Sequence, residues 1–379
     1  MQATVAEQYM NLDRGHSSAA NVIPSLDGIR AVSFLIVFLS HAYLGNIVPG
    51  AFGVTVFFFL SGYLITTLLR LEYDNSGRVS FRDFYLRRAL RILPPFYTVL
   101  ILAVILTWLG VSPGSLRIDA LVAVFAHVAN YWIIFRGYSG MPAGTGAYWS
   151  LAVEEHFYLV FPLVYVLLQR VLARQRFRQA LFLLVCCVAV LIWRILLVSR
   201  GHVGEYRTYL ATDTRIDSIL FGCALAVGGN PILDRLPGSP SLWRWLFLPL
   251  GVFLLFVTFV YHDESFRETF LYSLQGIGLI PIFVVAIREP GWGVFRLLNL
   301  PLVRQIGVLS YSLYLVHHVM LFLFEKQFPN ISPVAWACGA LVASILVALA
   351  IHALIEKPCG QLRKRLAHVK WRMASNRPG

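Results

Sequence analysis

Two ionisable residues, Arg30 and His41, lie in one apolar stretch of the chain, RAVSFLIVFLSH. Eleven residues of α-helix turn through about 1100°, so both side chains project from nearly the same face, roughly 16 Å apart along the axis. Asp27 precedes Arg30 by three residues and can pair with it. Neutral histidine is a competent base near pH 7, so the pair suggests a site for proton transfer. Taken alone, it fits equally well an arginine at a membrane interface and a histidine bonded to a neighbouring helix.

Other apolar stretches carry polar residues to a similar depth. An ionisable group inside a membrane costs about 2.5–3.5 kcal/mol on insertion scales, so each one needs a reason. The stretch YWSLAVEEHFY brings in Glu154 and Glu155. We therefore expect a shared polar cavity, in which His41 assisted by Glu154 would deprotonate a hydroxyl that attacks an activated acyl group. Two more helices contribute Arg215, Asp217, Ser310, Tyr311, Tyr314, His317 and His318.

Metal and disulfide sites are not expected. His317 and His318 are adjacent, so on a helix they project about 100° apart, which disfavours joint metal binding with His41. The HExxH zinc pattern is absent. Four of the five cysteines lie inside apolar runs, where cysteine usually behaves as a small hydrophobic residue.

A cationic cluster precedes the third long apolar run, in FYLRRALRILPP. Arg88 and Arg91 are three residues apart and share a helical face, while Arg87 and Arg91 form an i,i+4 pair. Such a fork can hold a phosphate group. The spacing alone fits equally well a polybasic segment that contacts lipid headgroups.

Membrane helices must position these residues. Of the 379 residues, 58% are hydrophobic and 13% are charged, whereas soluble domains carry about 25% charged residues. A soluble enzyme and a disordered chain are therefore excluded. At about 20 residues per crossing, the apolar residues supply roughly ten or eleven helices. The predicted fold class is an all-α polytopic membrane protein with its helices in one bundle.

Charge decides between ten crossings and eleven. An interrupted run at about 119–135 contains His127, Asn130 and Tyr131. If this run does not cross, most of the 32 Lys and Arg residues fall on the cytoplasmic side; if it crosses, the larger share falls outside. We therefore expect ten spans, both termini in the cytoplasm, and a re-entrant or interfacial segment at 119–135. The ten runs are about 29–45, 51–70, 95–111, 149–169, 179–199, 214–229, 243–261, 268–287, 305–325 and 334–355.

One membrane domain fills nearly the whole chain. We expect a polar cytoplasmic segment at 1–22, a membrane domain at 23–358 and a basic cytoplasmic tail at 359–379. The net charge of +13 then reflects topology and contact with anionic lipid headgroups. It gives no reason to expect nucleic acid as a partner.

Seven stretches resemble the membrane-bound acyltransferase 3 family, bacterial enzymes that O-acylate sugars and related hydroxyl compounds. No single stretch is decisive, but all seven occur in family order between residues 25 and 358. One departure is His156, which stands where the family usually has Gln, so we assign it no role. The stretches are SLDGIRAVSFLIVFLSH, FFFLSGYLIT, FYLRRALRILPP, WSLAVEEHFYLVFP, RIDSILFGCALA, SYSLYLVHH and IEKP.

The resemblance implies roles for the matched residues. Arg30 and His41 would be the essential pair, with His41 as catalytic base or transient acyl carrier, and Glu154 would belong to the family's tryptophan-serine-glutamate stretch. The family's arginine motif, expected to meet the phosphates of acyl-coenzyme A, corresponds to Arg87, Arg88 and Arg91. Substrate binding would fall to Trp149, Ser150, Tyr311, Tyr314 and His317.

The expected function is O-acylation at a bacterial inner membrane. Acyl-CoA, by resemblance acetyl-CoA, would enter from the cytoplasm as a co-substrate, with no permanently bound cofactor. The acceptor would be a carbohydrate hydroxyl, for example on an exopolysaccharide unit. Many family members add an extracytoplasmic hydrolase-like domain, so here either the membrane domain suffices or a separate glycan-synthesis protein takes part. The alternative is a transporter or flippase for an anionic glycan or lipid-linked sugar, which would ideally show an internal repeat; none is evident.

Overall fold

The computed structural model describes residues 24–201 and 204–363, and its named elements there are all helices. The predicted segment 1–22 and residues 364–379 of the predicted tail lie outside the described residues. In chain order the elements are α2 (Pro24–Leu39), η1 (Ser40–Leu44), α3 (Gly50–Ser76), α4 (Phe81–Trp108), α5 (Ile118–Phe125), α6 (Ala129–Arg136), η2 (Thr145–Tyr148), α7 (Trp149–Val171), α8 (Arg176–Ser199), α9 (Glu205–Leu210), α10 (Thr212–Gly228), α11 (Pro240–Leu242), η3 (Trp243–Phe247), α12 (Leu248–Val260), α13 (Glu264–Thr269), α14 (Leu271–Arg288), α15 (Phe295–Leu298), α16 (Pro301–Gln327), α17 (Pro333–Ile351) and η4 (His352–Glu356).

The predicted all-α membrane fold is confirmed. Within the described residues, nine helical segments are long and apolar enough to cross a membrane. The remaining predicted span corresponds to α10, which has only 17 residues and is buried along nearly its whole length. It packs against α3, α8 and α14. A helix that touches other helices on all sides meets little lipid, so α10 forms part of the centre of the bundle.

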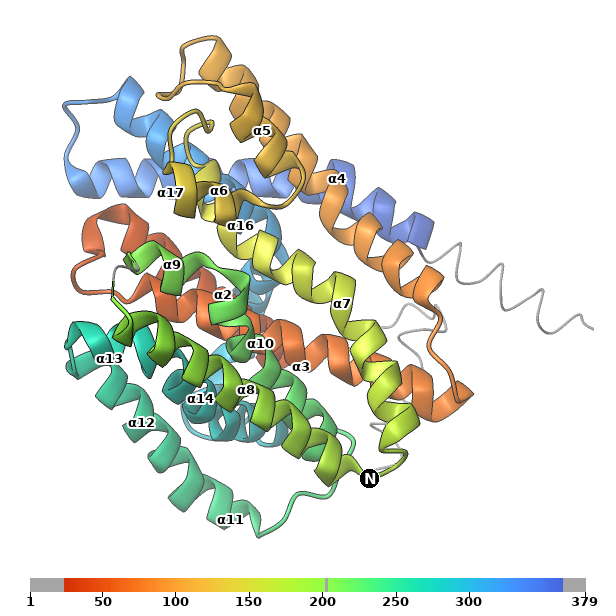
Figure 1. Ribbon diagram of the computed structural model, residues 1–379. Helices are drawn as coiled ribbons and strands as arrows, with labels where there is room; N and C mark the ends of the chain where they lie inside the picture. Colours follow the sequence, from red (N-terminus) through yellow and green to blue (C-terminus); the bar gives the residue numbers. More distant parts are fainter. Residues whose placement is uncertain (1–23, 202–203, 364–379) are drawn as a thin grey trace, which may run out of the picture.

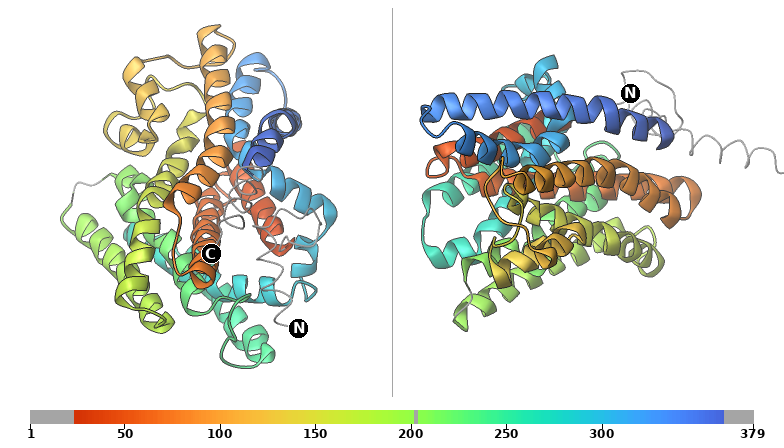
Figure 2. Two further views of the ribbon diagram at one scale, coloured as in Figure 1. Left: turned by 90° about the vertical axis from the view of Figure 1, so that its right-hand side faces the viewer. Right: turned by 90° about the horizontal axis from the view of Figure 1, so that it is seen from above.

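The long helices lie side by side, and consecutive ones run in opposite directions (Figure 1, Figure 2). The short helices α5, α6, α9 and α13 gather at one end of the bundle, called the α9 end below, and α11 lies at the other, the α11 end (Figure 1). α2 and α16 both run toward the α9 end. With α10 included, the alternation brings the start of α2 and the end of α17 to the α11 end.

The interrupted run at 119–135 forms two short helices, α5 and α6, of eight residues each. Each is about 12 Å long, too short to cross a membrane. The helical geometry is interrupted between them at His127, whose φ is +56°. Burial lowers the pKa of the His127 imidazole. Asn130 Nδ2 donates to the Leu210 carbonyl (3.3 Å) and the Tyr131 hydroxyl donates to Asp213 (3.4 Å). These bonds hold the broken segment against α9 and α10 at the α9 end.

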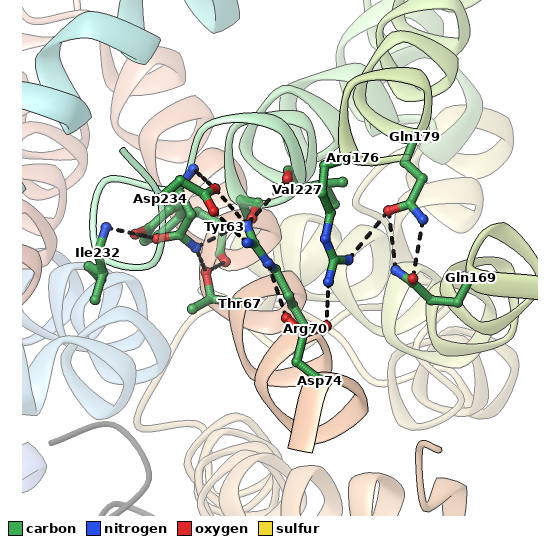
Figure 3. A network of polar contacts seen from close by, with 12 residues as sticks. Tyr63, Thr67, Arg70, Asp74, Gln169, Arg176, Gln179, Val227, Ile232 and Asp234 are labelled. Carbon is green, nitrogen blue, oxygen red and sulfur yellow. Dashed lines mark hydrogen bonds and ion pairs between the residues drawn. The ribbon is translucent and has the colours of Figure 1, made fainter. Parts of the chain in front are cut away.

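A network of polar contacts joins four parts of the chain at the α11 end (Figure 3). Arg70 of α3 pairs with Asp234, which follows α10, with Nη1 and Oδ2 2.7 Å apart. Its Nε also lies 3.5 Å from Asp74, which bonds to Arg176 of α8. The side-chain amides of Gln169 and Gln179 exchange hydrogen bonds of 3.2 and 3.1 Å between α7 and α8. This network fixes the α11 ends of these helices relative to one another.

Candidate active site

His41 lies where the first long helix loses its regular form. α2 ends at Leu39 and continues as a π-helical turn, η1. The backbone leaves helical geometry at Ala42 (φ −97°, ψ 58°) and Tyr43 (φ 68°, ψ −7°). Single π turns and left-handed non-glycine residues cluster at functional sites, because the surrounding structure must offset their cost. The break places His41 at the α9 end with an exposed side chain.

His41 contacts His317, a predicted site residue of α16. His41 Nδ1 lies 3.0 Å from His317 Nε2, and the two rings are nearly parallel, with centroids 5.3 Å apart. His317 is fully buried, and its Nδ1 lies 2.8 Å from the carbonyl oxygen of Tyr314. Phe34 meets the His317 ring edge-on, with centroids 5.8 Å apart. We call His41 and His317 the histidine pair.

A glycine contact fixes the two helices that carry the histidine pair. A Cβ atom added to Gly307 of α16 would lie 1.9 Å from the carbonyl oxygen of Asp27 in α2. A larger residue at this position would push the helices apart, as at other small-residue crossings in membrane proteins. Gly307 therefore helps to set the depth of His317 relative to His41.

His318 stacks on the ring of His41. The two rings stack, with centroids 4.4 Å apart and planes 13° apart. Behind His318, Gly144 of the loop GYSGMPAGTG adopts φ +81°, and an added Cβ would lie 2.4 Å from the backbone nitrogen of Val319. The buried Nδ1 of His318 has no hydrogen-bond partner among the described residues. The loop thus holds the part of α16 that covers His41.

A second polar group surrounds Glu154 deeper in the bundle. Its carboxylate accepts a hydrogen bond from the Tyr158 hydroxyl (3.0 Å), which in turn accepts one from Ser61 (2.5 Å). The charges of three arginines act on Glu154. The guanidinium of Arg88 also lies over the Tyr158 ring, 5.6 Å from its centroid. We call Arg30, Arg88, Arg91 and Glu154 the arginine–glutamate cluster.

His41 and Glu154 do not make the contact that the sequence led us to expect. Glu154 instead lies near Arg30, which precedes His41 by about 16 Å along α2. The reason is depth: Glu154 comes nine residues after the start of the Thr145–Val171 span, about 14 Å into the bundle. His41, by contrast, lies close to the α9 end of its own span.

The arginine motif divides into two parts. α4 begins at Phe81, so Arg88 and Arg91 lie about 10 and 15 Å along this helix, within the span rather than before it. Both keep some solvent exposure. Arg87 instead donates to Glu72 of α3 at 2.9 Å. Of the three predicted phosphate ligands, Arg88 and Arg91 therefore join Arg30 and Glu154, while Arg87 has its own carboxylate partner.

The remaining predicted substrate residues line the interior, and the hydroxyls of Ser150, Tyr311 and Tyr314 are hydrogen-bonded there. Ser150 Oγ lies 2.6 Å from the Tyr314 hydroxyl, and both residues are buried. The Tyr311 hydroxyl donates to the Ile92 carbonyl at 2.8 Å. Trp149 packs 5.7 Å from the guanidinium of Arg215, which is fully buried among aromatic rings. These side chains join α4, α7, α10 and α16 around the site.

Sequence reasoning missed Tyr158, Ser61 and Glu72. The first had a usable signal, because Tyr158 follows Glu154 by four residues and so shares its helix face. Ser61 and Glu72 come from α3, and only the tertiary structure brings them near: α3 packs against α7, and Glu72 pairs with Arg87 of α4. Among residues 24–201 and 204–363, no group of three or more His, Cys, Asp or Glu side chains is arranged to hold a metal ion.

Comparison with known proteins gives the family. The acyltransferase-domain profile of the acyltransferase 3 family matches residues 23–353. The chain belongs to this family. The prediction made from the seven stretches is therefore confirmed, and no solved structure matches the chain.

Curated relatives of this acyltransferase 3 protein are about twice as long as the matched region. The chain is 33% identical over 359 residues to a putative peptidoglycan O-acetyltransferase, YrhL, of Bacillus subtilis strain 168, covering 89% of the chain and 54% of the relative. It is 30% identical over 353 residues to the peptidoglycan O-acetyltransferase OatA of Listeria monocytogenes, covering 89% and 55%. A putative O-acetyltransferase of Staphylococcus aureus strain COL is 30% identical over 337 residues, covering 82% and 53%. The chain thus spans about half the length of these relatives.

Proposed function

We propose that this protein is an integral-membrane O-acetyltransferase that moves an acetyl group from acetyl-CoA to a hydroxyl of a glycan. The observation that carries the proposal is the placement of two polar groups on one helix. Arg30 belongs to the arginine–glutamate cluster and His41 to the histidine pair, and α2 joins them over about 16 Å. Coenzyme A likewise has phosphates at one end, a thioester at the other and a slender arm between them.

The cluster suits the phosphate end of the donor. Guanidinium groups bind phosphate oxygens through strong, charge-assisted hydrogen bonds. Arg88 and Arg91 retain exposure and reach toward the interior from α4, opposite Arg30 of α2. With the phosphates held there, the thioester extends along α2 to His41.

At His41 the reaction requires a base. The ring takes the proton of the acceptor hydroxyl as that oxygen attacks the thioester carbonyl. A carbon–oxygen bond forms, the carbon–sulfur bond breaks, and the departing thiolate receives the proton from the imidazolium to give free coenzyme A. Acetyl transfer through His41 itself would place the same ring nitrogen on the carbonyl carbon and arrive at the same products.

The charge pattern supports one orientation. Cationic residues concentrate in the loops at the α11 end, so the positive-inside rule puts this end in the cytoplasm and the α9 end outside. Donor then enters from the cytoplasm, and the acceptor glycan reaches His41 from outside, at a bacterial cytoplasmic membrane. The curated relatives named for their acceptor are named for peptidoglycan, so we propose a cell-wall glycan as acceptor in preference to an exopolysaccharide.

The test uses full-length protein purified in detergent, acetyl-CoA and soluble peptidoglycan fragments. Thiol release and the mass of the fragments are followed together, and we expect free coenzyme A and O-acetylated fragments in equal amounts. His41→Ala should abolish both, whereas His262→Ala, at an exposed histidine of the α12–α13 loop, should change neither. Uptake of unmodified glycan into proteoliposomes without thiol release would instead support a transporter and contradict the proposal.

A further inference from the structure

We propose that His317 is a positioning residue that keeps the proton of His41 on Nδ1 and thereby makes Nε2 the reacting nitrogen. The inference rests on the proposed function, because it assigns a role within the same reaction. It also goes further, since it names the atom of His41 that acts and the neighbour that prepares it. The observation behind it is a one-way chain of hydrogen bonds, from His41 through His317 to the Tyr314 carbonyl.

The direction of this chain follows from its last acceptor. A backbone carbonyl oxygen can only accept a hydrogen bond, so Nδ1 of His317 must carry a proton and donate it to Tyr314. In a neutral imidazole, the other nitrogen then has the lone pair. Nε2 of His317 is therefore an acceptor, and the partner that donates to it across 3.0 Å is Nδ1 of His41.

The burial of His317 supports the neutral form. Its side chain is fully buried between α2 and α16, in contact with Phe34 and Phe38. Within the described residues, no ion pair involves His317. A charged ring in such surroundings would be expensive, because nothing of opposite charge compensates it. His317 therefore stays neutral, and its Nε2 keeps the lone pair that accepts the hydrogen bond from His41.

His317 orients the base and does not conduct its proton. A relay would need an acceptor beyond His317 that could take the proton, but the chain ends on a carbonyl oxygen. The pair therefore resembles the part of a catalytic triad that fixes the tautomer and angle of a histidine. Nδ1 of His41 donates its proton to His317. Nε2 of His41 makes no hydrogen bond within the described part of the chain, so it is available to react. That nitrogen sits on an exposed residue at the α9 end.

Two substitutions at one position separate positioning from packing. Gln can present a side-chain oxygen near the site of Nε2 and so accept from His41, whereas Leu fills similar space without an acceptor. We expect His317→Leu to lower kcat by about 10²-fold or more, with little change in the KM for acetyl-CoA. His317→Gln should retain most of the activity. His262→Leu is the matched control, because His262 Nδ1 also donates to a carbonyl, that of Val260 at 2.7 Å, but on the surface.

Nitrogen NMR of protein labelled with ¹⁵N-histidine reads the tautomer directly. The His41 signals are identified by their loss in His41→Ala. Wild type and His317→Gln should show protonated Nδ1 and bare Nε2 at His41, and His317→Leu should show proton density moved to Nε2. Bare Nδ1 in the wild type, or full activity of a folded His317→Leu, would overturn the inference while leaving the proposed function intact. If wild-type protein transferred no acetyl group, the proposed function would fail, and the NMR result would still decide the tautomer.

Discussion

Two polar regions of this bundle use their hydrogen-bonding groups in opposite ways. Arg194 of α8 and Asp217 of α10 are both fully buried, with two parallel contacts of 3.0 and 2.7 Å. Arg194 also donates to the Thr269 carbonyl (2.9 Å) and to Ser273 Oγ (2.6 Å). The histidine pair, in contrast, buries one ring and leaves the other exposed.

The difference separates structural polar groups from reactive ones. Every donor of Arg194 is occupied, so this pair can hold α8, α10 and α14 together but has no atom left for a substrate. In the histidine pair, three of the four ring nitrogens make internal hydrogen bonds, and Nε2 of His41 makes none. The fully bonded Arg194–Asp217 pair therefore fits a structural role, whereas the open Nε2 of His41 fits a role in chemistry.

The largest expected effect comes from the histidine pair. His41→Ala should lower acetyl transfer by about 10³-fold or more. In the double variant His41→Ala/His317→Leu, we expect no further loss, because His317 acts only through His41. Steady-state kinetics of both single variants and the double variant measure this. Additive losses would show that His317 has a separate task.

Substitution in the Arg194–Asp217 pair should lower the stability of the protein and leave its activity almost unchanged. Arg194→Met removes one partner of a buried ion pair and should lower the free energy of unfolding by about 3–5 kcal/mol. Arg194→Met/Asp217→Leu removes both charges and should recover much of that loss. Unfolding in mixed detergent micelles gives the values, and the specific activity of the folded fraction should stay near that of wild type. A single variant as stable as wild type would refute this assignment.

The two parts of the arginine motif should also differ. Arg88→Gln removes a cation of the arginine–glutamate cluster and should raise the KM for acetyl-CoA about 10- to 100-fold, since charged hydrogen bonds contribute about 1.5–3 kcal/mol. Arg87→Gln should change this KM less than twofold, because Arg87 pairs with Glu72. Initial rates over a range of acetyl-CoA concentrations separate the two. Equal increases in this KM would show that Arg87 and Arg88 bind the donor together, which contradicts the division of the motif.

The smallest effect concerns the loop behind His318. Gly144→Ala should destabilise the protein by about 1–3 kcal/mol, because φ is +81° and the new Cβ meets the Val319 backbone. Gly77 lies in the same left-handed region (φ +68°, ψ 4°) with nothing within 4 Å of an added Cβ, so Gly77→Ala should cost only about 1 kcal/mol. Thermal unfolding of the two variants provides the comparison. An equal change would mean that the contact with α16 is relaxed at no cost.

The sequence predicted local features of the chain, but it did not predict how deep in the bundle each site residue lies. Spacing and composition were sufficient for the helical membrane fold and for the broken segment at 119–135. They wrongly put Glu154 beside His41, because the relative shift of α2 and α7 depends on packing between distant residues. The partner of His41 proved to be His317, whose depth depends on the close contact of Gly307 with Asp27. No local pattern reports such a contact.

One measurement tests the central claim most directly. Wild type, His41→Ala and His262→Ala are mixed with acetyl-CoA and peptidoglycan fragments, and released thiol and acetylated fragment are counted while each unfolding midpoint is recorded. The account predicts equal amounts of both products from wild type and His262→Ala, none above background from His41→Ala, and the same midpoint for all three. Acetylated product from a folded His41→Ala protein at the wild-type rate would contradict it.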